Sequence, residues 1–209
     1  VHEYVEIYAA GFTLAESPYS MVRISWVHKP KVIAEKLVFP RLGRISEVSS
    51  NYLNRLIENY TGFGTEVIRT GNAGDHAMSM QLADLLCYAS GFAVETYEIV
   101  NLLEQFGGIL PPTHPQVMSS EVDVFQIESR NPHLHEIKGD AHLEEMLCSS
   151  LGAIYHSPTC TQEVKDSIIA FLAEKGEPKP PVKIRPPIEV DLKHFTEILK
   201  QKSQTLTEF

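Results

Sequence analysis

Hydrophobic and polar positions follow two patterns along this chain, one typical of helices and one typical of strands. Apolar side chains recur every three to four positions in amphipathic stretches, which predict helices at 1–15, 43–60, 76–90, 97–106, 141–156, 161–175 and 191–202. Short runs rich in β-branched and aromatic residues predict strands at 19–27, 36–39, 65–69, 92–94 and 122–127. Strands interleaved with helices favour an α/β domain built in layers.

The predicted strands form little sheet. We expect 19–27 and 36–39 to pair as a hairpin across the basic turn at 28–31. The strand content is thin for a complete sheet, and the chain begins at Val1, with no Met, inside an amphipathic helix. Both features suggest a piece of a longer protein. Further on, 177–187 contains five prolines, which is typical of an extended surface arm.

The composition suits one globular domain with its own core. Of 209 residues, 43% are hydrophobic and 22% charged, and no apolar run reaches the ~20 residues that a membrane span needs. The formal charge of −9 argues against a general nucleic-acid binder, because phosphate contacts need a basic face. The three cysteines match no zinc motif, and we expect Cys87 and Cys148 to be inert core thiols. We therefore expect a cytoplasmic protein without a membrane or nucleic-acid partner.

The start of the predicted helix at 43–60 has the chemistry of an anion site. Gly43 exposes backbone N–H groups there, while Arg44 and Ser46 add further hydrogen-bond donors. Such a helix N-terminus binds phosphate or carboxylate groups well. The alternative is an ordinary helix start with an exposed arginine.

A glycine-punctuated turn at 70–76 precedes the predicted helix at 76–90. The glycines permit a close approach of a ligand to the backbone. Asp75 would then lie in the first helical turn, where the helix dipole favours its charged form. The alternative is a capped helix start with no ligand.

Two histidines, His133 and His135, follow the predicted strand at 122–127. Pro132 biases this run away from helix, so both rings can face one cleft beyond the strand end. Neutral imidazole nitrogens are common metal ligands, and a histidine side chain can also bind a phosphate group. The alternative is a solvated pair of loop histidines.

Read in order, these segments resemble the C-terminal half of the mannosyl-3-phosphoglycerate synthase family. The segments that carry the resemblance are 8–12, 21–23, 28–31, 43–47, 71–78, 125–128 and 131–136. They run in order over most of the chain, so the resemblance is more specific than any single motif. The tail beyond about residue 176 resembles the family more loosely.

The resemblance implies an α/β fold, the C-terminal part of a GT-A fold with a helical C-terminal region. Residues 1–139 would form the acceptor and metal side of the GT-A domain, and 140–209 the helical region, with the proline-rich arm at 177–187. The family is a retaining glycosyltransferase that moves mannose from GDP-mannose to 3-phosphoglycerate, toward the compatible solute mannosylglycerate. It uses a divalent metal, magnesium or else manganese, cobalt or zinc. A homodimer is expected by the same analogy.

The resemblance also gives individual residues a role. His133 would be the metal ligand, and Asp75 would lie near the reacting sugar, where the family usually has Glu. The acceptor phosphate would be bound by a larger set: Gly43, Arg44, Ser46, Asn72 and His135.

This chain departs from the family pattern by lacking two of the family's elements. The family's Asp-x-Asp element and guanosine-binding sheet lie before the point where this chain starts, so we expect the fragment alone to be inactive. A glucosyl-3-phosphoglycerate synthase-like transferase and a non-catalytic interaction or dimerisation module stay open as alternatives. A cupin-type metal protein also uses His-x-His but needs a glutamate where this chain has Gly139 and Asp140.

Overall fold

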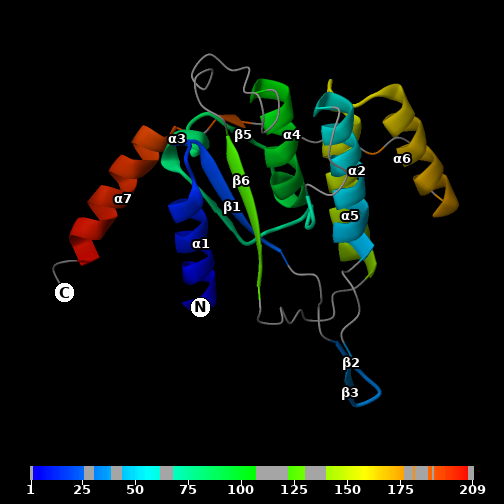
Figure 1. The fold of residues 1–209 in the computed structure, drawn as a ribbon, viewed down its shortest axis with the longest axis horizontal. Coiled ribbons are helices and arrows are strands. Elements are labelled where there is room, and N and C mark those ends of the chain that lie inside the picture. The colour runs from blue at the N-terminus through cyan, green and yellow to red at the C-terminus, as the bar shows by residue number, and fades with distance from the viewer. Residues whose placement is uncertain are drawn as a thin grey trace.

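The computed structural model describes most of the chain as an α/β arrangement (Figure 1). The described residues are 2–25, 31–38, 44–61, 68–106, 122–129, 140–176, 181, 188–189 and 191–206. The helices are α1 (His2–Leu14), α2 (Arg44–Thr61), α3 (Met80–Ala83), η1 (a 3-10 turn, Gly91–Ala93), α4 (Val94–Phe106), α5 (Asp140–Tyr155), α6 (Gln162–Glu174) and α7 (Leu192–Leu206). The strands are β1 (Ser20–Ser25), β2 (Lys31–Ile33), β3 (Lys36–Val38), β4 (His76–Met78), β5 (Cys87–Tyr88), β6 (Asp123–Glu128) and β7 (Ile188–Glu189).

A three-stranded sheet with the order β4-β1-β6 organises the described residues. The central strand, β1, pairs in parallel with β6 from Ser20↔Asp123 to Ser25↔Glu128. It pairs antiparallel with β4, with Arg23 opposite His76. Every residue of β1 is buried, as expected for a strand covered on both faces.

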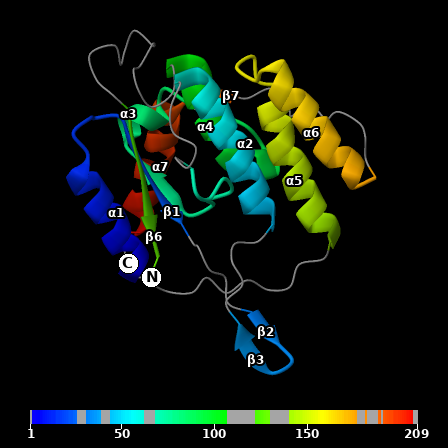
Figure 2. The ribbon, with the colours of Figure 1, turned by 45° about the vertical axis from the view of Figure 1, so that its right-hand side comes forward.

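The two faces of this sheet contact different helices. Successive side chains of a strand point to opposite faces. Val22 and Ile24 therefore pack against α1, while Met21 belongs to the main core with α2, α4, α5 and α6. In both views α1 lies on one side of β1 and β6, and α2, α4 and α5 lie on the other (Figures 1 and 2). Residues that alternate along β1 thus reach two separate environments.

The long predicted helices are confirmed, each within a few residues of its expected bounds. Sustained apolar periodicity explains this, because the apolar stripes of α2, α4, α5 and α6 pack together as one core. In α5, Leu147, Leu151 and Ile154 are buried as expected, whereas Leu143 is exposed. The thiols of Cys87 and Cys148 are only half-buried, and Cys160 is the buried cysteine, its pKa raised by burial to about 11.

The expected hairpin between 19–27 and 36–39 is wrong. β3 instead pairs with β2, across a two-residue turn at Ala34 and Glu35, both with positive φ. This small hairpin stands apart from the sheet (Figure 2). β1 takes its partners from β4 and β6, because only a long apolar strand gains from burial on both faces.

The predicted helix at 76–90 is also wrong, as is the strand at 92–94. Residues 76–78 form strand β4, followed by the short α3, capped by the hydroxyl of Ser79, and then by β5. Residues 91–93 form η1, which leads directly into α4. The expected strand at 65–69 lies partly outside the described residues, and 68–69 are not in a strand.

The expected division into 1–139 and 140–209 stays a prediction. Most of the proline-rich arm at 177–187 lies outside the described residues. In the described parts of the chain, none of the helices has the length and apolar character that crossing a membrane requires.

Candidate functional site

The carboxyl ends of β1 and β6 mark the edge of the sheet at which a site is expected. In open α/β sheets, ligands bind beyond these ends. Because β4 runs antiparallel to β1, its first residues lie at the same edge, and the amide of Ile24 donates to the carbonyl of Asp75 at 3.0 Å. The segment with His133 and His135 follows β6 in sequence, but both histidines lie outside the described residues.

Asp75 lies on the α1 side of this edge. It precedes β4 and faces Ile24 across the ladder, so strand alternation directs it away from His76 and toward α1. Burial, and then the nearby charge of Asp75, raise the pKa of Tyr4 and of Tyr8, both on α1. Asp75 therefore precedes a strand rather than opening a helix, and the helix-dipole argument for its charge is wrong.

The turn before Asp75 is held from below by a buried arginine. Arg23 is fully buried, and its Nη2 donates to the carbonyls of Thr70 and Gly71 at 3.3 and 3.1 Å. Its Nη1 donates to the carbonyl of Glu95 at 3.4 Å. Burial lowers the pKa of Arg23, while Glu98 and Glu95 act in the opposite direction. One side chain thus joins β1 to this turn and to the start of α4.

A buried carboxylate completes this network. Glu98 on α4 lies 3.7 Å from Arg23 Nη1 and 3.0 Å from His76 Nε2. His76 Nδ1 lies 2.9 Å from the carbonyl oxygen of Ala73. Burial lowers the pKa of His76, but the hydrogen bond and charge of Glu98 outweigh it, and the pKa is raised overall. Both ring nitrogens face acceptors, which only the doubly protonated imidazolium satisfies at once.

Asn72 ties the same turn to the helices on the other face. Its Oδ1 accepts a hydrogen bond from Ser49 Oγ at 2.6 Å, and its Nδ2 donates to Ser150 Oγ at 2.6 Å. The amide of Gly71 donates to Ser50 Oγ at 2.8 Å. The turn is therefore fixed to α2 and α5 as well as to β1 and α4.

The predicted acceptor residues are partly brought together. Ser46 is buried in the first turn of α2, and its carbonyl accepts from Ser49, which also bonds Asn72. Arg44 is the first residue of α2, so it lies at the same helix end, while Gly43 lies outside the described residues. Asp75 lies toward the opposite face, so the turn divides its polar groups between the two sides of the sheet.

Sequence reasoning missed the network beneath the turn. Arg23 carried a signal, because a charged residue stood in an apolar run between Val22 and Ile24. Such a residue is almost never fully buried unless it is paired. Its partners, Glu98 and His76, had no signal, because their neighbourhood to Arg23 arises only from the fold.

The described residues do not form a metal site. They contain no group of three or more His, Cys, Asp or Glu side chains that could hold an ion. His133, the predicted ligand, lies outside them, so that assignment stays a prediction.

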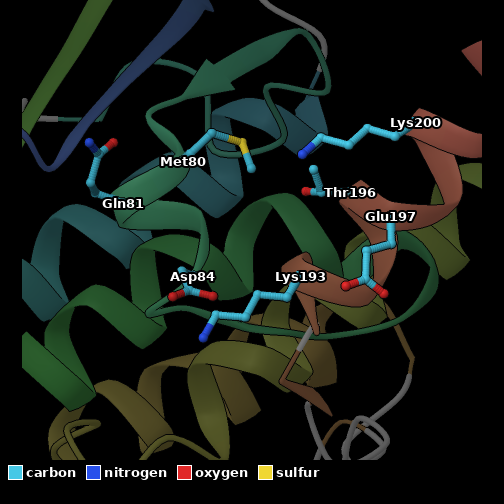
Figure 3. Close-up of a pocket in the computed structure, with 7 residues that line it drawn as sticks. All are labelled: Met80, Gln81, Asp84, Lys193, Thr196, Glu197 and Lys200. Atoms are coloured by element: carbon cyan, nitrogen blue, oxygen red, sulfur yellow. The ribbon is translucent and has the colours of Figure 1, made fainter.

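A hollow lies at the other edge of the sheet. α3 follows β4 beside Ser20, the first residue of β1, at the end opposite Asp75. Side chains from α3, the residue after it and α7 line this open hollow, and Figure 3 shows both positively charged lysines and negatively charged carboxylates around it. Its lining residues are Met80, Gln81, Asp84, Lys193, Thr196, Glu197 and Lys200. None of them belongs to the predicted site.

Comparison with known proteins shows the family that the chain matches. The family model described as Mannosyl-3-phosphoglycerate synthase matches residues 1–199. A mannosyl-3-phosphoglycerate synthase of Pyrococcus furiosus is 43% identical over 216 residues, covering 100% of this chain and 55% of the relative. One of Aeropyrum pernix is 35% identical over 206 residues, covering 97% of this chain and 53% of the relative. The chain therefore spans about half the length of these relatives.

Among solved structures, the chain is similar to glucosyl-3-phosphoglycerate synthase of Mycobacterium tuberculosis. In complex with UDP, that protein gives a TM-score of 0.44 at 14% identity, with 72% of this chain and 43% of the other covered. A complex with Mn²⁺, UDP and phosphoglyceric acid gives a TM-score of 0.42 at 15% identity, with 84% and 44% covered.

Proposed function

Because the chain belongs to the mannosyl-3-phosphoglycerate synthase family, we propose that it is the acceptor-side part of a retaining glycosyltransferase that moves mannose from GDP-mannose to 3-phosphoglycerate. The observation that carries this proposal is the family match over residues 1–199. It supports both the resemblance found in the order of the motifs and the expected α/β GT-A class. We assign the transfer to the whole protein, because this chain spans only about half of its relatives.

The acceptor phosphate is assigned to the start of α2. The first backbone N–H groups of a helix have no partner within the helix, and the helix dipole attracts anions there. Arg44 would add a bidentate donor to this end, with Gly43, Ser46 and His135 around it. Asn72 Nδ2 gives one N–H to Ser150, which leaves its second N–H for the phosphate.

Asp75 is assigned to the reacting sugar. As a half-buried carboxylate directly before β4, opposite the carboxyl end of β1, it would accept hydrogen bonds from sugar hydroxyls and stabilise positive charge that develops at the anomeric carbon. The acceptor hydroxyl would then attack the anomeric carbon from the same face from which the GDP leaving group departs, and the anomeric configuration would be retained. Tyr4 and Tyr8 of α1, whose pKa values are raised by burial and then by the charge of Asp75, would line the sugar site on this side.

A divalent metal belongs to the proposal only through His133. A hard cation needs several oxygen ligands, and the described residues do not supply such a group. When bound, the ion would neutralise charge on the diphosphate leaving group.

The test joins this chain to the part of the Pyrococcus furiosus relative that precedes the matched region. This hybrid protein is incubated with GDP-mannose and 3-phosphoglycerate, and the glycosylated product is identified by mass spectrometry. We expect product with both substrates present and none without 3-phosphoglycerate. GDP-glucose and UDP-glucose serve as competing donors, and a strong preference for either would favour the glucosyl alternative.

Variants then test the assigned residues. Asp75→Asn should lower kcat by about 10²-fold, as expected when a group that stabilises transition-state charge is removed. Asp84→Asn is the matched control, because Asp84 is exposed directly after α3, at the opposite edge of the sheet. Equal activity in the two variants would refute the role of Asp75. Full metal-dependent activity in His133→Ala would refute the ligand assignment.

A further inference from the structure

Arg23 is an unusual residue for the middle of a sheet. It is fully buried in the central strand, between Val22 and Ile24, which pack against α1 on the other face. Burying a guanidinium costs several kcal/mol unless its donors and its charge are matched. An apolar side chain would fill the same space without this cost. Partners for the donors and the charge of Arg23 must therefore explain why an arginine occupies this position.

The guanidinium meets backbone acceptors that no apolar side chain could satisfy. Nη2 reaches two consecutive carbonyls, those of Thr70 and Gly71, at 3.3 and 3.1 Å. Two carbonyls bonded to one nitrogen fix the orientation of both peptide planes, because the donor directions of the planar fork are rigid. Nη1 reaches the carbonyl of Glu95 and lies near Glu98, so the fork is itself anchored on α4.

The same network holds the turn at a second point. His76 bridges Glu98 and the carbonyl of Ala73, and Ala73 lies two residues before Asp75. The carbonyls at 70, 71 and 73 are thus all bonded by side chains that share Glu98 as their charge partner. Beyond them, the carbonyl of Asp75 accepts from Ile24, the residue after Arg23. Little freedom remains for the backbone between Thr70 and Asp75.

We propose that Arg23, together with Glu98 and His76, is a positioning network that sets the turn at 70–75 and thereby the place of Asp75. This inference rests on the proposed function, since it assigns Asp75 to the transferred sugar. Arg23 itself touches no substrate, because it is fully buried beneath the turn. Its effect on transfer passes through the backbone that it bonds.

Replacement by lysine separates positioning from charge balance. Arg23→Lys keeps the positive charge beside Glu98, but a single ammonium on a flexible stem cannot reproduce the fork to Thr70, Gly71 and Glu95. In the hybrid protein we expect kcat to fall by about 10²-fold, the cost typical of a reacting group misplaced by 1 Å. KM for both substrates should stay within a few-fold of the parent value. Each rate is divided by the concentration of folded protein, and the folded fraction at the assay temperature is taken from a thermal unfolding curve.

Arg55→Lys is the matched control. Arg55 is partly exposed on α2, where it pairs with Glu163 of α6. The same chemical change there should leave kcat unchanged, since exposed ion pairs contribute little. If Arg23→Lys also kept full kcat, the arginine would serve charge balance only, and the positioning role would be refuted.

Hydrogen exchange supplies a readout that does not depend on transfer. In the 209-residue chain, Arg23→Lys should speed amide exchange in peptides covering 69–76, while α6 keeps its protection. If the parent hybrid transfers no hexose, the proposed function fails, yet this measurement still decides the structural half of the inference. Unchanged exchange at 69–76 would overturn it.

A second variant covers the case in which Arg23→Lys does not fold. His76→Gln changes the more exposed end of the network, where the ring is 15% exposed. Glutamine can bond Glu98 but cannot reach the carbonyl of Ala73 at the same time. We expect faster exchange at 69–76 and a roughly tenfold fall in kcat, less than for Arg23→Lys, because the bonds from Arg23 to Thr70 and Gly71 remain. His194→Gln, on exposed α7, is its control, and equal behaviour of the two would refute the network.

Discussion

Gly71 offers the sharpest test of how tightly the turn is held against α2. Its amide donates to Ser50 Oγ at 2.8 Å, which brings the two backbones together. A Cβ at this position would lie 2.5 Å from Ser49 Oγ, 2.9 Å from the amide nitrogen of Ser50 and 3.0 Å from the carbonyl carbon of Ser49. Two of these atoms belong to the helix backbone and cannot move aside alone. Gly71→Ala must therefore push the turn away from α2.

The size of the effect follows from two opposing contributions. Overpacking by one carbon in a tight site costs about 1–3 kcal/mol. Alanine lowers the entropy of the unfolded chain, which returns about 0.4–1 kcal/mol. At the midpoints of these ranges the net loss of unfolding free energy is about 1.3 kcal/mol, or roughly 3–5 °C in Tm for a chain of this length.

Gly74→Ala provides the matched control within the same turn. A Cβ at Gly74 would meet only Glu95 Oε1, at 3.4 Å, which is an ordinary contact with a flexible side chain. We expect its Tm to stay at the parent value or rise slightly. Thermal unfolding followed by circular dichroism at 222 nm compares the two variants. Equal Tm values would show that the turn is not clamped on α2 and would refute the reasoning.

Two further predictions concern His76 and the N-terminus of α6. The pKa of His76 is raised in the fold, so its contribution to stability is complete below its unfolded pKa of about 6.5 and is lost as pH rises through the folded pKa. Chemical denaturation should therefore show a larger difference in unfolding free energy between the parent and His76→Gln at pH 5.5 than at pH 8.5. A difference that grows toward pH 8.5 would contradict this. Thr161 caps α6 by accepting from the amide of Val164, so Thr161→Ala should cost about 1 kcal/mol, whereas Thr161→Ser should cost far less in the same urea titrations.

The parts of the fold that sequence predicted well are those decided locally. α2, α5 and α6 carry long apolar stripes, and such periodicity identifies a helix without knowledge of its partners. β4 is the opposite case, because three residues carry no period, and pairing with β1 alone makes them a strand. The helix predicted at 76–90 failed for this reason.

The features of the candidate site also fall into those that the local sequence indicates and those that depend on the fold. The order of the motifs points to Asp75 and the start of α2 as candidates, because these residues are read directly from the sequence, and both assignments stay predictions. The face on which Asp75 lies could not be predicted, since it depends on the register of β4 against β1. The pairing of Arg23 with Glu98 joins two elements distant in sequence, and neither residue alone points to the other.

The central place of β1 has a consequence for how the chain folds. Its neighbours in the sheet are β4, which begins at residue 76, and β6, which begins at residue 123. Pairings between distant segments form slowly, because the intervening chain must first be closed into a loop. During synthesis, β1 therefore emerges long before its parallel partner, and the edge of β1 that pairs with β6 stays open to other chains for that time. A ribosome paused before residue 123 would hold a nascent chain that is prone to aggregate.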